Sequence, residues 1–316
     1  MRIIFMGTPD FAVATLQRLV ENHFEVVAVV TAPDKPVGRG LKMSESPVKK
    51  YAVSQKIPVL QPEKLKSKRF LEELAAYRAD LQVVVAFRML PEAVWAMPPK
   101  GTINLHGSLL PQYRGAAPIN WAVINGEKTT GVTTFFIEKE IDTGKIIFTD
   151  TLAIGENDTA GELHDKMMWT GADLVVKTVK AIASGNHPGQ PQHFEGELKA
   201  APKIFKETTE IDWSKDAASL HNFVRGLSPY PAAWTSLAGR QMKIFETRPL
   251  DTLPANLEQV QNEKYPLYTD HRKNLVISTG NGFLSVLSLQ LEGRKRMTAE
   301  EFLRGYRFNS EIGKHS

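Results

Sequence analysis

Asn104 and His106 are separated by a single apolar residue in the run Asn104-Leu105-His106-Gly107. Residues 102–105 are typical of a short β-strand, and the alternation of side chains along a strand places the amide and the imidazole on the same face. Two such groups can donate hydrogen bonds to a developing oxyanion and move a proton at one reacting centre. Ligands in open α/β sheets bind outside the carboxyl ends of the strands, so both residues stand where chemistry is expected.

Asp142 supplies a carboxylate in the sequence Ile141-Asp142-Thr143-Gly144, just before another predicted strand. This carboxylate can orient the His106 ring and set its tautomer. The residues alone leave a second interpretation open, because aspartate in such a sequence commonly has only a local role in a turn. A lone histidine is likewise more often a packed or solvated side chain, although Asn104 and the strand end favour a catalytic role for His106.

The elements that must position these residues alternate between short apolar runs and amphipathic segments. Strands are predicted at residues 2–6, 25–31, 81–86 and 102–105, and a helix that opens at Asp10 lies between the first two. This pattern predicts βαβ units around a mostly parallel sheet, which is the α/β class. The turn Gly7-Thr8-Pro9-Asp10 holds one glycine, whereas the dinucleotide-binding fingerprint needs three, so a nicotinamide or flavin enzyme is disfavoured.

The second half of the chain predicts two more strands, a linker and a second domain. Strands are expected at residues 130–137 and 145–149, and the capping-box patterns at Thr159 and at Thr298 each predict the start of a helix. A helix at 216–226 and β-rich runs at 233–237, 241–247, 275–279 and 283–289 predict a small β domain in the form of a barrel. The expected division is a first domain over 1–188, a linker over 189–206 and a second domain over 207–316.

The composition excludes several classes of protein. The chain has 316 residues, 42% of them hydrophobic, and no cysteine, which rules out disulfides, thiolate nucleophiles and Cys-ligated zinc. Its histidines lack metal-ligand spacing with carboxylates, so no metal site is predicted. The apolar runs at 26–30 and 83–87 are too short to span a membrane, and the first residues are typical of a strand rather than of a secretory signal. A cytoplasmic protein is therefore expected.

Basic residues are concentrated in one part of the chain. The formal net charge is only +4, but residues 31–70 hold ten Lys and Arg against three acidic residues. Within this region, residues 32–50 are interrupted by proline and glycine and carry Lys35, Arg39 and Lys42, which predicts a long connection without regular structure. From the charge alone, a solvated insertion and a loop that contacts a phosphate backbone are equally supported.

Several motifs resemble those of the folate-dependent formyltransferases. They are the runs from Asn104 to Pro111 and from Tyr113 to Ile119, the tripeptide Gly131-Val132-Thr133, and Ile141-Asp142-Thr143-Gly144. Other segments resemble the branch of that family that formylates methionyl initiator tRNA, namely residues 5–11, 33–40, 46–49 and Ile211-Asp212-Trp213-Ser214. The resemblance extends from the first residue into the C-terminal part of the chain.

This resemblance implies a Rossmann-like catalytic domain followed by an OB-like domain that binds tRNA. It implies transfer of a formyl group from 10-formyltetrahydrofolate to the α-amino group of methionyl initiator tRNA, which gives N-formylmethionyl-tRNA for translation initiation. No metal is implied, and a monomer is expected. One stretch departs from the family pattern, because residues 86–91 are one residue shorter than the segment that helps to form the wall of the pteridine pocket.

The same resemblance assigns roles to individual residues. Asn104, His106 and Asp142 are the implied catalytic group. The implied folate-binding segment is Ser108, Leu109, Leu110 and Pro111. The candidates for tRNA contact are basic residues of the two expected domains: Lys35, Arg39, Lys42, Arg294, Lys295 and Arg296.

Three other functions share parts of this pattern. A formyltransferase for amino sugar nucleotides and a formyltetrahydrofolate hydrolase use the same Asn/His/Asp group, but the basic region and the segment at 211–214 weigh against both. A non-enzymatic RNA-binding module is disfavoured because Asn104, His106 and Asp142 are all present.

Overall fold

The computed structural model describes residues 1–37, 42–262 and 264–308. The described chain divides into two compact units, each made of separated stretches. The first unit contains the described residues of Met1–Pro118, Thr129–Ala153 and His164–Pro202, and the second contains Ile119–Lys128, Ile154–Leu163 and the described residues from Lys203 onward. The boundaries predicted at residues 188 and 206 treat each domain as one continuous stretch, and they stay a prediction.

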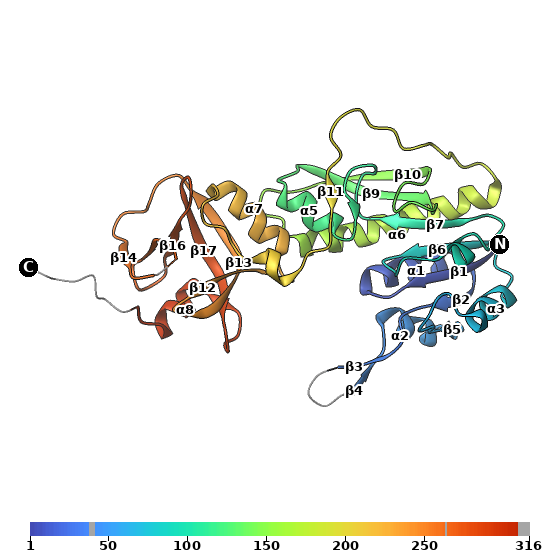
Figure 1. The fold of residues 1–316 in the computed structure, drawn as a ribbon, viewed down its shortest axis with the longest axis horizontal. Helices are drawn as coiled ribbons and strands as arrows, with labels where there is room; N and C mark the ends of the chain where they lie inside the picture. The colour runs from blue at the N-terminus through green and yellow to red at the C-terminus, as the bar shows by residue number, and fades with distance from the viewer. Residues whose placement is uncertain (38–41, 263, 309–316) are drawn as a thin grey trace, which may run out of the picture. The chain divides into compact units, whose positions relative to one another are not determined.

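A seven-stranded sheet forms the centre of the first unit (Figure 1). The order of its strands is β10-β9-β7-β6-β1-β2-β5. Their bounds are β1 (Arg2–Gly7), β2 (Glu25–Val30), β5 (Val59–Leu60), β6 (Leu81–Val85), β7 (Thr102–His106), β9 (Thr129–Phe136) and β10 (Ile146–Ala153). The pairs from β7 to β5 are parallel, and β9 and β10 are antiparallel. The predicted mostly parallel α/β sheet is confirmed.

Helices cover this sheet because their apolar positions match its two faces. The helices of the first unit are α1 (Asp10–Glu21), α2 (Pro47–Ser54), α3 (Lys68–Ala76), α4 (Glu92–Trp95) and the greater part of α6 (Ala160–Ser184). Helix α5 (Pro118–Ile124) lies almost wholly in the second unit. Phe70 and Leu74 of α3 pack with Ile4, Met6 and Val84 of the sheet. The helix α1 contacts β1, β2 and β6. The sequence indicated α1 and α6 but not α3 and α4.

The segment at residues 32–50 was expected to lack regular structure, and this expectation is wrong. It contains an antiparallel hairpin of β3 (Lys35–Val37) and β4 (Lys42–Ser44), and α2 begins at Pro47. Ser46 caps α2, because its hydroxyl accepts a hydrogen bond from the backbone N–H of Lys49 at 3.0 Å. Proline, which often interrupts secondary structure, fits here because Pro36 lies in a strand with one partner and Pro47 at the first position of a helix.

An antiparallel sheet forms the centre of the second unit, and the predicted β-rich domain is thereby confirmed. Its strands follow the path β12-β13-β17-β16-β15-β14, with β18 paired to β17. The bounds are β12 (Ala233–Leu237), β13 (Arg240–Leu250), β14 (Glu258–Val260), β15 (Leu267–Thr269), β16 (Leu275–Ser278), β17 (Phe283–Leu291) and β18 (Met297–Thr298). The helices α7 (Ala217–Leu227) and α8 (Ala299–Gly305) complete the unit, and α8 begins at the predicted capping box of Thr298 and Glu301.

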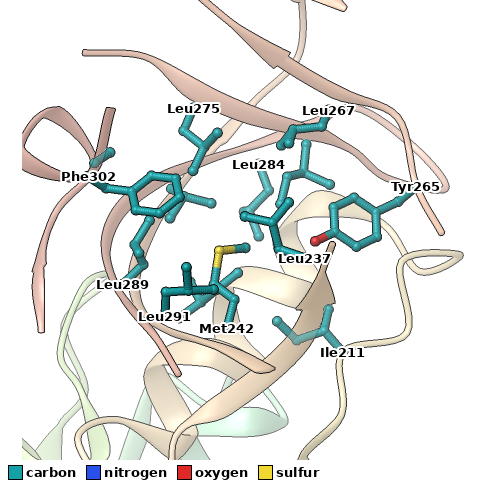
Figure 2. Close-up of a cluster of buried hydrophobic side chains, with 14 of the residues drawn as sticks. Ile211, Leu237, Met242, Tyr265, Leu267, Leu275, Leu284, Leu289, Leu291 and Phe302 are labelled. Carbon is teal, nitrogen blue, oxygen red and sulfur yellow. The ribbon is translucent and has the colours of Figure 1, made fainter. Parts of the chain in front are cut away.

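Apolar side chains from these strands and helices enclose a single core, which Figure 2 shows at its centre. Met242, Leu284 and Leu289 come from neighbouring strands, and Phe302 comes from α8. All four are buried. Along β17, Leu284, Val286, Leu289 and Leu291 are buried in this core, and the alternation shifts by one residue at Ser288, where the pairing with β13 is irregular.

Two side chains of α7 bind the distant segment at 154–163 into the second unit. His221 contacts the backbone carbonyl of Glu156 through Nε2 at 3.2 Å, and the Arg225 guanidinium donates to the carbonyl oxygens of Gly155 and Asp158. Burial lowers the pKa of His221 and of Arg225. These bonds satisfy backbone carbonyls that no strand or helix partner serves.

No helix in the described part of the chain has both the length and the apolar character needed to cross a bilayer.

Substitution of Leu284 by alanine tests the core of the second unit. Leu284 is fully buried on β17, so its truncation is expected to lower the free energy of unfolding by about 2–5 kcal/mol in a urea titration. Leu287 lies on the same strand but is 36% exposed, and Leu287→Ala is expected to change this free energy by less than about 1 kcal/mol. Equal losses for both variants would contradict the assigned core face.

Candidate active site

Asn104 and His106 lie on β7, at the carboxyl edge of the sheet. β7 pairs in parallel with β6 on one side and antiparallel with β9 on the other, and His106 is opposite Thr133. The Asn104 side chain is half-buried, and its oxygen Oδ1 is buried without a hydrogen-bond partner among the described residues. A buried polar atom of this kind is costly to leave unpaired, which is typical of a group that binds a substrate.

The His106 ring is held between two acceptors. It is 6% exposed, and its Nε2 lies 2.9 Å from the backbone carbonyl oxygen of Tyr113. Because a carbonyl oxygen can only accept, Nε2 carries a proton. On the other side of the ring, Nδ1 lies 3.8 Å from Oδ2 of Asp142. The Asp142 carboxylate thus faces Nδ1 from beyond hydrogen-bond distance, where it can orient the ring.

Asp142 has a role beyond that of a local turn aspartate. Its Oδ2 accepts a hydrogen bond from the backbone N–H of Gly115 at 3.0 Å, far away in the sequence. Its backbone has a φ of 55°, an uncommon conformation for a residue with a Cβ atom. The structure thus brings together Asp142 and His106, which the sequence could pair only by inference. Their catalytic roles stay a prediction.

The predicted folate-binding segment continues directly from β7, and Thr133 fixes its path. The Thr133 hydroxyl donates to the carbonyl oxygen of Ser108 at 2.7 Å and accepts from the N–H of Leu110 at 3.1 Å. Ser108 and Leu110 are buried, whereas Leu109 and Pro111 are half-buried. Gly131 leaves room for Leu109, because a Cβ atom there would lie 2.5 Å from Leu109 Cδ2. Folate binding by these four residues stays a prediction.

The stretch at residues 86–91, which departs from the family pattern, follows β6 at the same edge of the sheet. Ala86 has a φ of 46°. The Arg88 guanidinium donates to the carbonyl oxygens of Pro62 and Glu63, and burial lowers the pKa of Arg88. Met89 is 74% exposed. This stretch is thus held by Arg88 and presents the apolar side chain of Met89 to solvent.

Residues 190–201, most of the predicted linker, form part of the first unit and brace the site. We call them the strap. The strand β11 (Ala200–Ala201) of the strap pairs in parallel with β8 (Arg114–Gly115). The carbonyl oxygen of Lys199 accepts a hydrogen bond from the N–H of Tyr113 at 2.7 Å. No local sequence signal indicated this pairing, because each strand has only two residues and carries no alternating pattern.

The hairpin of β3 and β4 is anchored by partly buried polar contacts at its base. The ammonium of Lys49 forms ion pairs with the carboxylates of Asp34 and Glu45, and Gln61 donates to Asp34 at 2.7 Å. The hydrogen bonds from Lys49 and Gln61 lower the pKa of Asp34. Lys49 is therefore committed to two carboxylates and serves to hold the hairpin.

The predicted tRNA-contact residues differ in whether their side chains already have a partner in the structure. Lys35 is exposed on β3, Lys42 contributes its backbone to β4, and Arg39 lies outside the described residues. In the second unit, Arg294 and Lys295 are exposed. Arg296 is also exposed, but it pairs with Glu246 at 2.5 Å, donates to the Ser288 hydroxyl at 2.9 Å and lies over the Phe245 ring. Contact with tRNA stays a prediction for all six residues.

No cluster of three or more His, Cys, Asp or Glu side chains that could hold a metal ion occurs among the described residues.

Comparison with known proteins places the chain in a family. The family model for formyl transferase matches residues 1–179, and the model for the formyl transferase C-terminal domain matches residues 203–307. The chain belongs to the formyl transferase family. The resemblance found in its motifs is thereby confirmed.

Two relatives of this formyl transferase are similar over almost their whole length. The methionyl-tRNA formyltransferase of Bacteroides thetaiotaomicron is 52% identical over 98% of this chain and 97% of its own. The methionyl-tRNA formyltransferase of Phocaeicola vulgatus is 54% identical over 97% of this chain and 96% of its own.

Solved structures share the fold of this formyl transferase at low identity. WlaRD, a sugar 3N-formyl transferase, has a TM-score of 0.66 and 19% identity, over 93% of this chain and 99% of its own. HypX from Aquifex aeolicus, in complex with tetrahydrofolic acid, has a TM-score of 0.63 and 18% identity, over 96% of this chain. The chain spans only 47% of HypX.

Gly144 provides a test of the Asp142 loop in this formyl transferase. A Cβ atom at Gly144 would lie 1.7 Å from the carbonyl oxygen of Phe136, so Gly144→Ala must displace the loop that carries Asp142. A displacement of about 1 Å is expected to reduce kcat for formyl transfer by about 100-fold. The control is Gly189→Ala, where the nearest atom to the new Cβ would be Lys145 Cδ at 3.8 Å. Retention of wild-type kcat by Gly144→Ala would show that the loop position is not critical.

Proposed function

We propose that this chain transfers the formyl group of 10-formyltetrahydrofolate to the α-amino group of methionyl initiator tRNA. The observation that carries the proposal is the His106 ring held between the Tyr113 carbonyl and the Asp142 carboxylate, two residues along β7 from the Asn104 amide. The methionyl-tRNA formyltransferases that are about half identical over nearly the whole chain support the choice of acceptor.

The chemistry requires stabilisation of a negative oxygen. The neutral α-amine attacks the formyl carbon, a new C–N bond forms, and the carbonyl oxygen becomes an oxyanion. The Asn104 amide N–H is the proposed donor to this oxyanion, and the His106 Nε2–H is the second proposed donor once it exchanges the Tyr113 carbonyl for the oxyanion. The oxyanion then collapses, and the bond between the formyl carbon and N10 of the folate breaks.

The reaction also moves one proton from the attacking amine to N10 of the leaving folate. His106 is the proposed carrier: the protonated ring gives its proton to N10 as the bond to the formyl carbon breaks, and the neutral ring then takes the proton from the former amine nitrogen. Asp142 is proposed to keep the ring oriented while its charge changes, and the hydrogen bond from Gly115 holds the carboxylate in place for this purpose. Ser108 to Pro111 are proposed to contact the folate from the segment next to Asn104 and His106.

The acceptor is a large polyanion, so basic residues are proposed to bind its backbone. Lys35 and Lys42 of the hairpin, together with Arg39, are the proposed contacts in the first unit, and Arg294 and Lys295 are their counterparts in the second. Arg296 is a weaker candidate, because binding to a phosphate would have to replace its ion pair with Glu246. Translation initiation takes place in the cytoplasm, where we propose that the protein acts as a monomer.

Transfer of labelled formyl from 10-formyltetrahydrofolate tests the function. Methionyl initiator tRNA, free methionine and an amino sugar nucleotide are offered in parallel, and formate release is measured without an acceptor. Product on the tRNA alone is expected. Formylation of the sugar alone would overturn the tRNA assignment, and formate release without transfer would indicate a hydrolase.

His106→Ala and Asp142→Ala test the division between chemistry and binding. Each variant is expected to lower kcat by about 10²- to 10⁴-fold, because proton transfer and oxyanion stabilisation are lost. The Kd for methionyl initiator tRNA is expected to stay within about two-fold, since neither residue is proposed to bind phosphate. His193→Ala is the matched control, because the His193 side chain is 83% exposed. Equal loss of tRNA binding in both catalytic variants would contradict this division.

Lys35→Ala and Arg39→Ala test the hairpin. Each is expected to weaken tRNA binding and to reduce the slope of log Kd against log salt by about 0.7–0.9, the effect of one lost phosphate contact, while kcat at saturating tRNA is retained. Lys68→Ala is the control, because the Lys68 side chain is 89% exposed on α3 and away from the hairpin in sequence. An equal change of slope in all three variants would indicate a nonspecific effect of charge.

A further inference from the structure

Gln192, in the strap, makes hydrogen bonds with both of its side-chain ends at the edge of the site. Its amide Nε2 donates to the carbonyl oxygens of Asp142 and Gly144, at 2.9 Å and 2.8 Å. Its Oε1 accepts from Nε and Nη2 of Arg114, at 3.1 Å and 2.6 Å. The side chain thus joins the loop that carries Asp142 to the segment next to Gly115.

One of these two segments carries the Asp142 carboxylate, and the other donates a hydrogen bond to it. The Asp142 loop supplies the carboxylate itself, and Gly115, next to Arg114, supplies the N–H that binds Oδ2 at 3.0 Å. Any change in the separation of the loops therefore changes the position of Oδ2 relative to His106 Nδ1, which is now 3.8 Å. Gln192 sets this separation, because it bonds to both loops at once.

The Asp142 loop depends on such support for its conformation. Asp142 has a φ of 55°, which costs about 1 kcal/mol or more for a residue with a Cβ atom. On one side, Gly144 packs so closely on the carbonyl oxygen of Phe136 that no Cβ atom would fit between them. On the other side, the two hydrogen bonds from Gln192 satisfy the carbonyl oxygens of Asp142 and Gly144. The loop is thereby fixed from both sides.

We infer that Gln192 is a positioning residue for formyl transfer, which acts through Asp142 and does not touch the substrates. The inference rests on the proposed function and extends it to a residue outside the Asn104, His106 and Asp142 group. It also gives the strap a part in catalysis. A 1 Å error in the position of a catalytic group can reduce turnover by about two orders of magnitude, so a contact of this kind is expected to be visible in kcat.

Two substitutions separate the contacts of Gln192. Gln192→Met removes the donor and the acceptor while keeping a side chain of similar length. Gln192→Glu keeps an acceptor for Arg114 but has no N–H to donate to the two carbonyl oxygens. Gln190→Met is the matched control, because Gln190 lies in the same segment, has an exposed side chain and pairs with Ile146 only through its backbone.

Steady-state kinetics with 10-formyltetrahydrofolate and methionyl initiator tRNA provide the readout, with thermal melting as a check of folding. Both Gln192 variants are expected to lower kcat by about 10- to 100-fold with KM for either substrate within about three-fold, whereas Gln190→Met keeps wild-type values. Wild-type kcat in Gln192→Met would overturn the inference. Wild-type kcat in Gln192→Glu alone would also overturn it, because the bonds to the Asp142 loop would then be dispensable.

A double-mutant cycle with Asp142→Ala distinguishes positioning from general loss of structure. If Gln192 acts through Asp142, Gln192→Met is expected to lower kcat no further when Asp142 is already alanine. Independent, multiplicative losses would overturn the inference. The wild-type enzyme separates this test from that of the proposed function, because absence of transfer by the wild type refutes the function itself.

Discussion

The Asp142 carboxylate, held between the Gly115 N–H and the His106 ring, is the interaction on which the site depends. A carboxylate in this position gives the imidazole a fixed orientation and a partner for a positive charge. The cost is a left-handed backbone at Asp142, and the surrounding contacts offset it. The loop is held by the close packing of Gly144 on the Phe136 carbonyl and by the two hydrogen bonds from Gln192. These contacts keep the carboxylate close to the His106 ring, which its electrostatic effect on the ring requires.

The order of strands in the sheet explains why the chemistry is at this edge. β6 and β7 extend from β1 on one side, and β2 and β5 extend from it on the other. The loops after β1 and β6 therefore diverge at the carboxyl edge, which is where open α/β sheets bind ligands. β7 is the last parallel strand before the antiparallel β9. Its end carries Asn104 and His106, and Thr133 of β9 fixes the segment that follows.

Basic residues serve two purposes in this molecule, and only the structure separates them. Lys49 and Arg296 are bound to carboxylates: Lys49 holds the base of the hairpin, and Arg296, although exposed, has Glu246 as a partner. Lys35, Arg294 and Lys295 are exposed, where a polyanion can reach them. A count of charge along the sequence gives the same weight to both groups. A Lys or Arg side chain that is already paired with a carboxylate must break that ion pair before it can bind a phosphate, so its contact with the phosphate is less favourable.

The sequence by itself determined the fold class and the chemistry. Periodicity predicted most strands of both sheets and the helices that begin at Asp10, Thr159 and Thr298, because strand and helix patterns depend on neighbouring residues. The pair of Asn104 and His106 was visible for the same reason, since residues two apart on a strand share a face. The motifs that carry the family resemblance are also continuous in sequence.

Only the tertiary structure decided what depends on contacts between distant residues. It placed Asp142 beside His106, joined the predicted linker to the catalytic loops through β11 and Gln192, and brought the segment at 154–163 into the second unit through His221 and Arg225. It also showed a hairpin where proline and glycine suggested an irregular loop. Apart from the hairpin, whose strands are close in sequence, these features depend on contacts between residues far apart in the chain. Such contacts leave no periodic pattern in the residues that make them.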